Sequence, residues 1–556
     1  MRVASLLTLA MIGSAAAAAG AFGCRRAVHD APGDVAPSSG DSAESETTPA
    51  SSLQAPSKGK LASRAMETLV FEQPNATSKK IGYLRAGAIV ERRGAIAGTA
   101  GCPGGWFPIE PRGFVCVGRE ATLDVDESIV TAAWRRPDVT AGLPYGYAVV
   151  RNAGAPFYTR LPTNEEAKRF EPDWDYHFRT LAGAEKEESQ EGGYPPLSSL
   201  PSDSPLAPGE GTLPLEASPG VLAGWATDGR DDPMPAFLAS GGFVPNLSGL
   251  AWAQRTPYDG GTSCDPGSAG CIPLDASRPR KRLGISFLET FRAGDRRWLL
   301  TSDLLLMPAD RVRLVRGTSF HGVELGDGPG ALQLPIVFVK RQGAKRYQFD
   351  KKKMVTLDGP AGELGWRVAL QAAKKQRVVG GDRYHELADG TYVADDDVVR
   401  LDPIKKMPKW GKDGERWIEI NIAKQTLLAV DGGTPTYATL VSTGSGGLAS
   451  PKDDPYVTPR GIFRIHTKHV AATMDSNQPE AEFELRDVPY IQYFLNGFAL
   501  HAAYWHDQFG TPRSHGCINL APRDAQRLFQ FTKPDVPPSW HGAMQALTGT
   551  VVWIHA

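Results

Sequence analysis

Turn-forming residues occur along the whole chain, and this feature constrains the fold more than any other. The sequence has 60 glycines and 44 prolines among its 556 residues. Such a chain suits short strands and loops better than long helical bundles. At roughly 150 residues per domain, its length also predicts three to four domains with separate cores. We therefore expect a mainly β protein built from several modules.

The charge of the chain is nearly balanced. Lys and Arg number 61 and Asp and Glu number 62, which gives a formal net charge of −1. A protein that wraps nucleic acid along its surface needs a strongly basic footprint. The sequence therefore predicts no nucleic-acid partner, and it leaves the oligomeric state open.

Residues 1–24 have the form of a secretory signal. Arg2 precedes an apolar stretch over 4–22, and small residues lie close to Cys24. A charged start, an apolar middle and a small-residue end are typical of export signals, so we expect an exported, periplasmic protein. The end also resembles the lipobox of bacterial lipoproteins, which implies a lipid on Cys24 as the protein's only contact with the membrane. Phe22 departs from that pattern, and ordinary cleavage or an uncleaved anchor are the alternatives.

A tether is expected after the signal. Residues 25–64 are dominated by Ala, Pro, Ser, Gly, Asp and Glu. Such a segment buries too little apolar surface to offset the entropy of ordering it. We expect it to be disordered and to let the folded body stand away from a membrane.

The six cysteines fit an oxidising compartment. Cys102 and Cys116 flank a short turn, and Cys264 and Cys271 close a small loop, so both pairs are predicted as local disulfides. Buried free thiols are the alternative, since the sequence cannot establish the geometry that a disulfide needs. With Cys24 assigned to the signal, one cysteine is left over, Cys517.

Short apolar runs separated by turns continue through residues 65–401. Within 65–123 they predict a small β-barrel, which resembles bacterial SH3-like domains. Weaker echoes of this pattern cover 140–320, with a Pro/Ser/Gly-rich insertion at 183–220, and 330–401. None of these regions carries a catalytic signature, so we expect them to bind or to act as spacers. The five strand candidates of the first barrel are 69–71, 81–84, 88–90, 106–109 and 113–117.

Residues 402–556 differ in character. Residues 416–422 alternate strictly, which places three Ile side chains on one face of a strand. Residues 426–430 and 436–443, joined by an Asp-Gly-Gly turn, complete a β-meander. The glycine-rich stretch 444–447 follows a strand, but no helical pattern follows it, so a dinucleotide-binding loop is not expected.

The chemistry concentrates in residues 498–520. Cys517 follows His515 by two residues, and His501 lies upstream at the end of an apolar run. A thiol needs a base because a free Cys, with a pKa of about 8.5, is only a few per cent thiolate at neutral pH. Gly516 would allow an unusual backbone turn that exposes amide N–H groups to a developing oxyanion. These residues predict a nucleophilic cysteine site.

At this point the sequence resembles the YkuD-type L,D-transpeptidases. The resemblance covers residues 414–556 and implies a β-sandwich catalytic domain at the carboxyl end of the chain, after the SH3-like modules. The family signature is a His, a spacer containing Gly, and Ser-His-Gly-Cys followed by an aliphatic residue and Arg or Asn. The matching positions are His501, Gly510, Ser514, His515, Gly516, Cys517, Ile518 and Asn519.

The resemblance assigns a role to each residue of the site. Cys517 would be the nucleophile and His501 its general base, oriented by the carbonyl of Ala502. His515 would line the site, and the amides of Gly516 and Cys517 would form the oxyanion hole.

The resemblance also suggests residues that would contact the substrate. Ser514 and Asn519 would position its polar stem, and Met474 would belong to a lid. The candidate pocket walls, which ordinary core packing would explain equally well, are Tyr490, Tyr493 and Phe494.

The implied reaction is acyl transfer in peptidoglycan. In the family, the Cys attacks a tetrapeptide stem, D-Ala leaves, and the thioester is passed to an acceptor. We expect an amine of a second stem, which gives a 3→3 cross-link. The alternatives are a protein amine, which anchors that protein to the wall, and water, which trims the stem. No cofactor is implied.

Zinc binding and simple burial are the alternatives to a nucleophilic role for Cys517. His501, His506, His515 and Cys517 offer the imidazole and thiolate ligands that zinc prefers, but their spacing matches no common zinc motif. Cys517 could also be an ordinary buried thiol, and His506 taken alone is more typical of a structural histidine. Neither alternative accounts for the whole signature, so no metal is expected.

Overall fold

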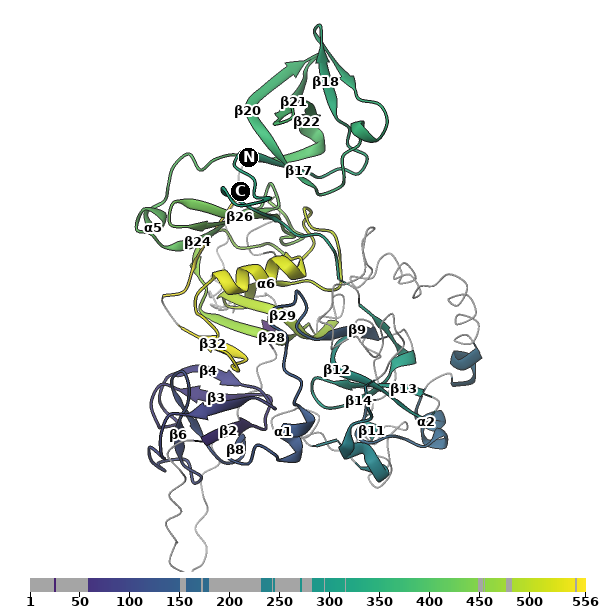
Figure 1. Cartoon of the computed structure of the whole chain (residues 1–556), viewed down its shortest axis with the longest axis vertical. Coiled ribbons are helices and arrows are strands. Elements are labelled where there is room, and N and C mark those ends of the chain that lie inside the picture. Colours follow the sequence, from purple (N-terminus) through teal and green to yellow (C-terminus); the bar gives the residue numbers. More distant parts are fainter. Residues whose placement is uncertain are drawn as a thin grey trace, which may run out of the picture.

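The computed structural model is mainly β, as expected (Figure 1). Its described residues are 25–26, 59–150, 157–171, 174–179, 232–242, 244–245, 271–272, 283–294, 296–315, 317–448, 454, 456–476, 483–545 and 548–556. The predicted signal, Cys24 and the insertion 183–220 lie outside them. Among the residues described, no helix is both long and apolar enough to cross a membrane.

The first module, residues 59–122, has a strand at each of the five positions expected from the sequence. These are β3 (Thr68–Phe71), β4 (Lys80–Leu84), β5 (Ile89–Arg92), β6 (Trp106–Pro108) and β7 (Phe114–Cys116). Two further strands, β2 (Gly59–Ser63) and β8 (Ala121–Thr122), pair with each other, and β2 also pairs with β5.

The predicted tether ends earlier than residue 64. Leu61 and Ala62 of β2 are completely buried, so this segment contributes to the core instead of linking to it. The tether range also holds β1 (Arg25–Arg26), which pairs with β28 (Thr467–Ser476) of the C-terminal domain. The apolar pair of β2 is too short to stand out from the polar sequence before it.

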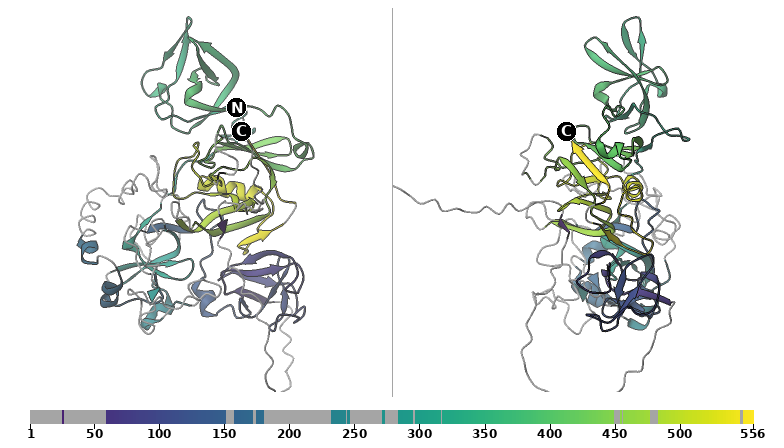
Figure 2. Two further views of the ribbon diagram at one scale, coloured as in Figure 1. Left: turned by 180° about the vertical axis from the view of Figure 1, so that it is seen from behind. Right: turned by 90° about the vertical axis from the view of Figure 1, so that its left-hand side faces the viewer.

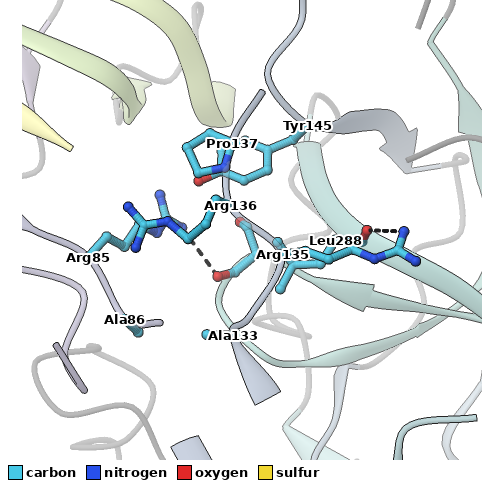
Figure 3. Close-up of a pocket in the computed structure, with 9 residues that line it drawn as sticks. Arg85, Ala86, Ala133, Arg135, Arg136, Pro137, Tyr145 and Leu288 are labelled. Carbon is cyan, nitrogen blue, oxygen red and sulfur yellow. Dashed lines mark hydrogen bonds between the residues drawn. The ribbon is translucent and has the colours of Figure 1, made fainter. Parts of the chain in front are cut away.

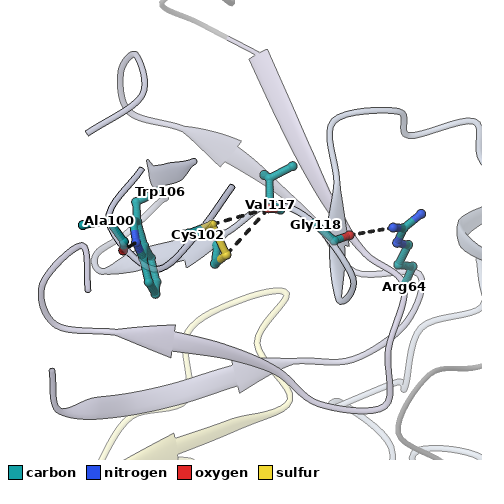
Figure 4. Close-up of a disulfide and its surroundings, with 7 residues drawn as sticks. Arg64, Ala100, Cys102, Trp106, Val117 and Gly118 are labelled. Carbon is teal, nitrogen blue, oxygen red and sulfur yellow. Dashed lines mark hydrogen bonds between the residues drawn. A yellow bond between two sulfur atoms is a disulfide. The ribbon is translucent and has the colours of Figure 1, made fainter. Parts of the chain in front are cut away.

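A disulfide fixes one end of the first module (Figure 4). Cys102 and Cys116 are bonded, with their Cα atoms 5.8 Å apart. Beside it, the indole N–H of Trp106 donates to the Ala100 carbonyl at 2.9 Å, and the Trp106 ring packs edge-on against Phe71. For the other predicted pair, Cys264 lies outside the described residues.

The central module, residues 146–314, is organised around the long strand β12 (Leu283–Ala293). This strand pairs with β9 (Gly146–Val150) and with β13 (Arg296–Thr301). Its further described elements include β10 (Phe157–Tyr158), α2 (Asn164–Phe170), β11 (Cys271–Ile272), β14 (Leu306–Pro308) and β15 (Val312–Leu314). The helix α2 begins with a capping box formed by Thr163 and Glu166.

The third module, residues 336–401, has a sheet of its own and projects from one end of the molecule (Figures 1 and 2). Seven strands follow one another in the order β19-β18-β22-β21-β20-β17-β23. Their bounds are β17 (Ile336–Val339), β18 (Tyr347–Asp350), β19 (Lys353–Thr356), β20 (Ala369–Val379), β21 (Asp382–Leu387), β22 (Tyr392–Ala394) and β23 (Val398–Leu401). The SH3-like character of all three modules stays a prediction.

The C-terminal domain is a sandwich of two sheets. One runs in the order β16-β26-β25-β24-β33-β27, and the long strands β28 and β29 dominate the other. As the alternation predicted, Ile418, Ile420 and Ile422 share one core between the sheets. The strands outside the second sheet are β16 (Val323–Glu324), β24 (Arg416–Asn421), β25 (Thr426–Asp431), β26 (Thr434–Leu440), β27 (Gly461–Arg464) and β33 (Val551–His555).

The second sheet carries the signature region of the sequence and packs against one helix. Its strands after β28 are β29 (Phe483–Leu495), β30 (Phe498–Ala502), β31 (Ile518–Leu520) and β32 (Gly542–Met544). The helix α6 (Pro522–Phe531) packs against β29 and β30. Proline at its first position suits a helix start, where the missing N–H costs nothing.

The first two modules are joined to the C-terminal domain by strand pairing. β4 pairs with β32, and β12 runs parallel to the start of β29. A buried ion pair reinforces this junction, because Nη1 and Nη2 of the Arg85 guanidinium bind the two carboxylate oxygens of Asp487, at 2.5 and 3.0 Å. Ser286 and Ser302 of the central module donate to the same carboxylate. Three parts of the chain thus meet at Asp487.

A small cavity of about 10 Å³ lies beside this junction (Figure 3). That volume is about the space of one water molecule. Arg85, Arg135, Arg136 and Tyr145 are among the residues that line it. None of the described residues that line it belongs to the segment 498–520, so this cavity is separate from the predicted site.

Candidate active site

Parallel pairing of two short strands brings the predicted base and thiol together. β30 and β31 lie side by side, with His501 opposite Asn519 and Leu500 opposite Ile518. Cys517 immediately precedes β31. Its side chain belongs to a different core cluster from that of Ile518, as expected when successive side chains alternate. The side chains of His501, in β30, and Cys517, just before β31, therefore lie on the same face of the sheet.

The imidazole of His501 is held in one tautomer. Its Nδ1 lies 3.0 Å from the carbonyl oxygen of Ala502, and the ring stacks on Trp505 with 5.7 Å between centroids. A carbonyl oxygen only accepts hydrogen bonds, so Nδ1 must carry the proton. The neutral ring then has its lone pair on Nε2, which is the arrangement that a general base requires.

Cys517 carries a reduced thiol and is completely buried. Its Sγ lies 3.7 Å from the carbonyl oxygen of Gly497. An acyl donor can reach this sulfur only if the residues that cover it move apart. The neighbouring His515 is contacted by two aromatic rings, Tyr456 at 5.1 Å and Phe483 at 5.3 Å between centroids.

The turn before Cys517 is fixed by hydrogen bonds within it. Gly516 has φ +100°, a conformation that residues with a side chain rarely adopt. Ser514 Oγ donates to the Cys517 carbonyl and accepts the Gly516 N–H at 3.1 Å. Thr458 Oγ1 donates to the Gly516 carbonyl at 2.9 Å. The predicted oxyanion donor Gly516 is thus bonded to Ser514 here, and the Ser514 hydroxyl fixes the turn.

The predicted aromatic walls divide between two cores. Tyr493 and the lid candidate Met474 lie in the cluster that contains Cys517, whereas Tyr490 and Phe494 lie in the core of the sandwich. The Tyr490 hydroxyl donates to the Ala141 carbonyl, and its ring packs on Phe529. Alternation along β29 explains the division, which places Tyr490 and Phe494 in the core of the sandwich.

Asn519 is bound on both its backbone and its side chain. Its backbone N–H donates to the Ser442 carbonyl at 2.9 Å, and its side-chain amide lies 2.9 Å from Nε2 of His506. His506 Nδ1 accepts the N–H of Gln508 at 3.2 Å. His506, which resembles an ordinary structural histidine in the sequence, is therefore linked to the signature residue Asn519.

Buried charged residues outside the signature also reach this region, and the sequence motifs did not indicate them. Arg367 of the third module binds the carboxylate of Asp507 through two nitrogens, at 2.6 and 2.8 Å. Asp487 of β29 forms the corresponding pair with Arg85 of the first module. Asp487 stands close to two other charged residues, Glu484 and Arg486, so the sequence did not single it out as a buried carboxylate. Arg367 had no distinguishing signal either.

The histidines and the thiol are not arranged as a metal site. Among the described residues, no group of three or more His, Cys, Asp or Glu side chains is placed to hold a metal ion. Both ring nitrogens of His506 already face hydrogen-bonding partners.

Comparison with known proteins gives one family match. Residues 415–554 match the YkuD family, described as the L,D-transpeptidase catalytic domain. No curated protein matches the chain.

Three solved structures illustrate the structural likeness. An L,D-transpeptidase (Yku) from Stackebrandtia nassauensis is 25% identical, with 26% of this chain and 56% of that one covered, at a TM-score of 0.18. The catalytic domain of the E. faecium L,D-transpeptidase is 22% identical, covering 26% and 98%, at 0.20. An L,D-transpeptidase from Mycobacterium tuberculosis H37Rv is 17% identical, covering 34% and 77%, at 0.20. This chain thus spans little more than half of the Stackebrandtia structure.

The family match begins and ends within the two-sheet sandwich. It includes β30, β31 and the turn that carries Cys517. The resemblance seen in the sequence is confirmed: residues 415–554 of this chain are a YkuD-type L,D-transpeptidase catalytic domain.

Proposed function

We propose that this chain is a cysteine-dependent L,D-transpeptidase that cross-links peptidoglycan. The observation that carries the proposal is the pairing of β30 with β31, which sets His501 beside the Cys517 turn, with its Nδ1 bonded to the Ala502 carbonyl so that a neutral ring presents Nε2 as a base. A thiol next to such an imidazole is the arrangement of an activated nucleophile. The substrate lies in the cell wall, in agreement with the export signal expected from the sequence.

In the first half-reaction, His501 Nε2 takes the thiol proton of Cys517. The sulfur attacks the carbonyl carbon that precedes the terminal D-Ala of a tetrapeptide stem, and a C–S bond forms. The C–N bond to D-Ala then breaks, and the leaving amine takes the proton from His501. The products are a thioester on Cys517 and free D-Ala.

The second half-reaction returns the thiol. An acceptor amine loses a proton to His501 and attacks the thioester carbonyl, and the C–S bond breaks as an amide forms. An amine on a neighbouring stem gives a 3→3 cross-link. A protein amine would give an anchored protein, and water would give a trimmed stem, so the acceptor alone separates these outcomes.

The oxyanion formed in each half-reaction needs hydrogen-bond donors. We assign this role to the N–H groups of Gly516 and Cys517. Gly516 would exchange its bond to Ser514 Oγ for a bond to the oxyanion. Such preorganised donors typically contribute about 10²–10³-fold in rate each.

The test is D-Ala release from purified tetrapeptide muropeptides by the full chain. Cys517→Ala and His501→Ala should each abolish release, and intact-mass measurement should find an acyl adduct on Cys517 of the unsubstituted protein. His321→Ala serves as the control, because this exposed histidine lies far along the chain from the motif. Full activity of either site variant would refute the proposal, and product analysis would identify the acceptor.

A further inference from the structure

The loop between the predicted base and the predicted nucleophile is held from outside its own domain. Residues 503–513 connect β30 to the Cys517 turn, and Asp507 lies completely buried within them. Arg367 Nη1 and Nη2 bind the two oxygens of the Asp507 carboxylate, and Nη1 also donates to its backbone carbonyl at 3.1 Å. Such bidentate pairs fix orientation as well as distance.

Arg367 itself is rigidly placed in the third module. Its backbone N–H donates to the Val339 carbonyl at 2.8 Å, and its φ of +61° is uncommon for a residue with a side chain. The guanidinium lies over the rings of Trp366, at 3.9 Å, and Phe320, at 4.7 Å. In this position the head group faces Asp507.

His506, the residue before Asp507, links this loop to Asn519, which lies two residues beyond Cys517. His506 Nδ1 accepts a hydrogen bond from Gln508, so the proton of the neutral ring is on Nε2. Burial, and then unfavourable electrostatic interactions of a His506 cation with Arg513, His501 and Arg367, hold the pKa of His506 well below its usual value, which keeps the ring neutral.

The His506 proton defines how the Asn519 amide must lie. A donor at Nε2 requires the amide oxygen of Asn519 as its acceptor, and in the present amide orientation that oxygen has no partner among the described residues. If the amide is turned so that its oxygen faces His506, its nitrogen points away from His506. Asn519 is two residues beyond Cys517 and opposite His501.

We propose that Arg367 is a positioning residue for the Cys517 site, through Asp507, His506 and Asn519. The third module would then be part of the catalytic apparatus as well as a binding or spacing element. This inference rests on the proposed function for its activity readout, but its geometry does not depend on the substrate.

The experiment compares full-length variants in each of which one of two buried ion pairs is broken. Arg367→Gln and Arg367→Lys remove the fork to Asp507, and Lys keeps the charge. Arg311→Gln is the matched control, because Arg311 is equally buried and binds Glu171 at 2.9 Å within the central module. Each variant is measured for its melting temperature, for kcat and KM of D-Ala release, and for the pH profile of Cys517 alkylation by iodoacetamide.

We expect both Arg367 variants to lower kcat at least tenfold with KM changed less than twofold, and to alter the alkylation profile. Arg311→Gln should lower the melting temperature and leave both readouts within twofold. A folded Arg367→Gln protein with unchanged kcat and alkylation would overturn the inference, as would an equal loss in Arg311→Gln.

Asp507→Asn provides a second route if Arg367→Gln does not fold. It keeps the shape of the side chain, and it should reproduce the effects of Arg367→Lys. If the unsubstituted protein releases no D-Ala, the proposed function fails, while a changed alkylation profile in these variants would still support the positioning role. Unchanged alkylation in both would reject it.

Discussion

The first and third modules each reach the C-terminal domain with one buried arginine, but the surroundings of the two arginines differ. Arg85 extends from a module whose strand β4 pairs with β32 of the C-terminal domain. Arg367 extends from a module whose strands form a separate sheet. Side chains reinforce a continuous backbone connection in the first case, and they supply much of the connection in the second.

The carboxylate partners differ as well. Asp487 lies within the long strand β29 and is bound by Arg85, Ser286 and Ser302. Asp507 lies in the loop that leads to the Cys517 turn and is bound by Arg367. A pair anchored in a central strand should affect the stability of several modules, whereas a pair anchored in a loop should affect mainly the placement of that loop.

The largest effect on stability is expected at Asp487. Replacing it with Ala leaves the Arg85 guanidinium buried without a counter-charge, which typically costs about 3–5 kcal/mol. Urea unfolding followed by tryptophan fluorescence should show this loss in the transition that includes the first and central modules. A loss below about 1 kcal/mol would mean that strand pairing alone holds the junction, and the contrast with Arg367 would disappear.

The same pair predicts how stability depends on pH. Burial raises the pKa of Asp487, but the charge of Arg85 and the hydrogen bonds outweigh burial and hold it well below its usual value. A carboxyl with a depressed folded pKa stabilises the protein above its unfolded pKa, about 3.9, and loses this contribution as the pH falls further. The stability difference between the unsubstituted protein and Asp487→Asn should therefore shrink below about pH 4.

The disulfide should have the next largest effect, and a more local one. The bond between Cys102 and Cys116 closes a loop with a sequence separation of 14, for which the chain-entropy model gives about 3 kcal/mol. The double variant Cys102→Ser, Cys116→Ser should destabilise the first module by that order. If it also lowers kcat for D-Ala release, the first module influences the site as strongly as the third, and the comparison would have to be revised.

The strands and the motif could be predicted from the sequence because both are local signals. The alternation over 416–422 and the runs of the first module each specify a strand within a few residues. The signature around His501 and Cys517 contains the predicted nucleophile, the predicted base and the glycine turn. None of these depends on knowing which distant segment is a neighbour.

The connections between modules could not be predicted, because they depend on which distant segments become neighbours. Arg85 and Asp487 are separated by about four hundred residues, and nothing near either one names its partner. The division of Tyr490 and Tyr493 between two cores depends on which sheet covers each face of β29. The amide of Gly516 looked available because the sequence does not show which way the nearby Ser514 hydroxyl turns.

Both arginines compared above are buried and paired with a carboxylate. A buried cation without such a partner shows what the carboxylate contributes. Lys468 is almost completely buried, and its Nζ donates to the carbonyls of Phe529 and Thr532 at the end of α6. Burial lowers the pKa of Lys468 to about 7, and the charge of Asp535 only partly opposes this. Unlike Arg85, whose pKa burial would lower but Asp487 raises above its ordinary value, Lys468 should titrate near neutrality.

The sign of its effect follows from proton binding. Between pH 7 and 9 the unfolded Lys, with a pKa of about 10.4, keeps its proton, while the folded one loses it. Stability must rise with pH wherever the unfolded state binds more protons. The unsubstituted protein should gain about 2 kcal/mol over this range relative to Lys468→Met, as measured by urea unfolding at each pH. Parallel curves would show that the α6 carbonyls keep Lys468 charged.

The smallest effect is expected where a similar pair lies on the surface. Arg527 binds Glu324 at 2.8 Å, but more than half of the Glu324 side chain is exposed to solvent. Exposed pairs contribute about 0–1 kcal/mol, because water already solvates both charges and salt screens them. Arg527 also keeps its packing over Tyr437 without Glu324. Glu324→Gln should therefore change the unfolding free energy by less than about 1 kcal/mol, and less in high salt. A loss near that of Asp487→Ala would show that burial is not what separates strong from weak pairs in this protein.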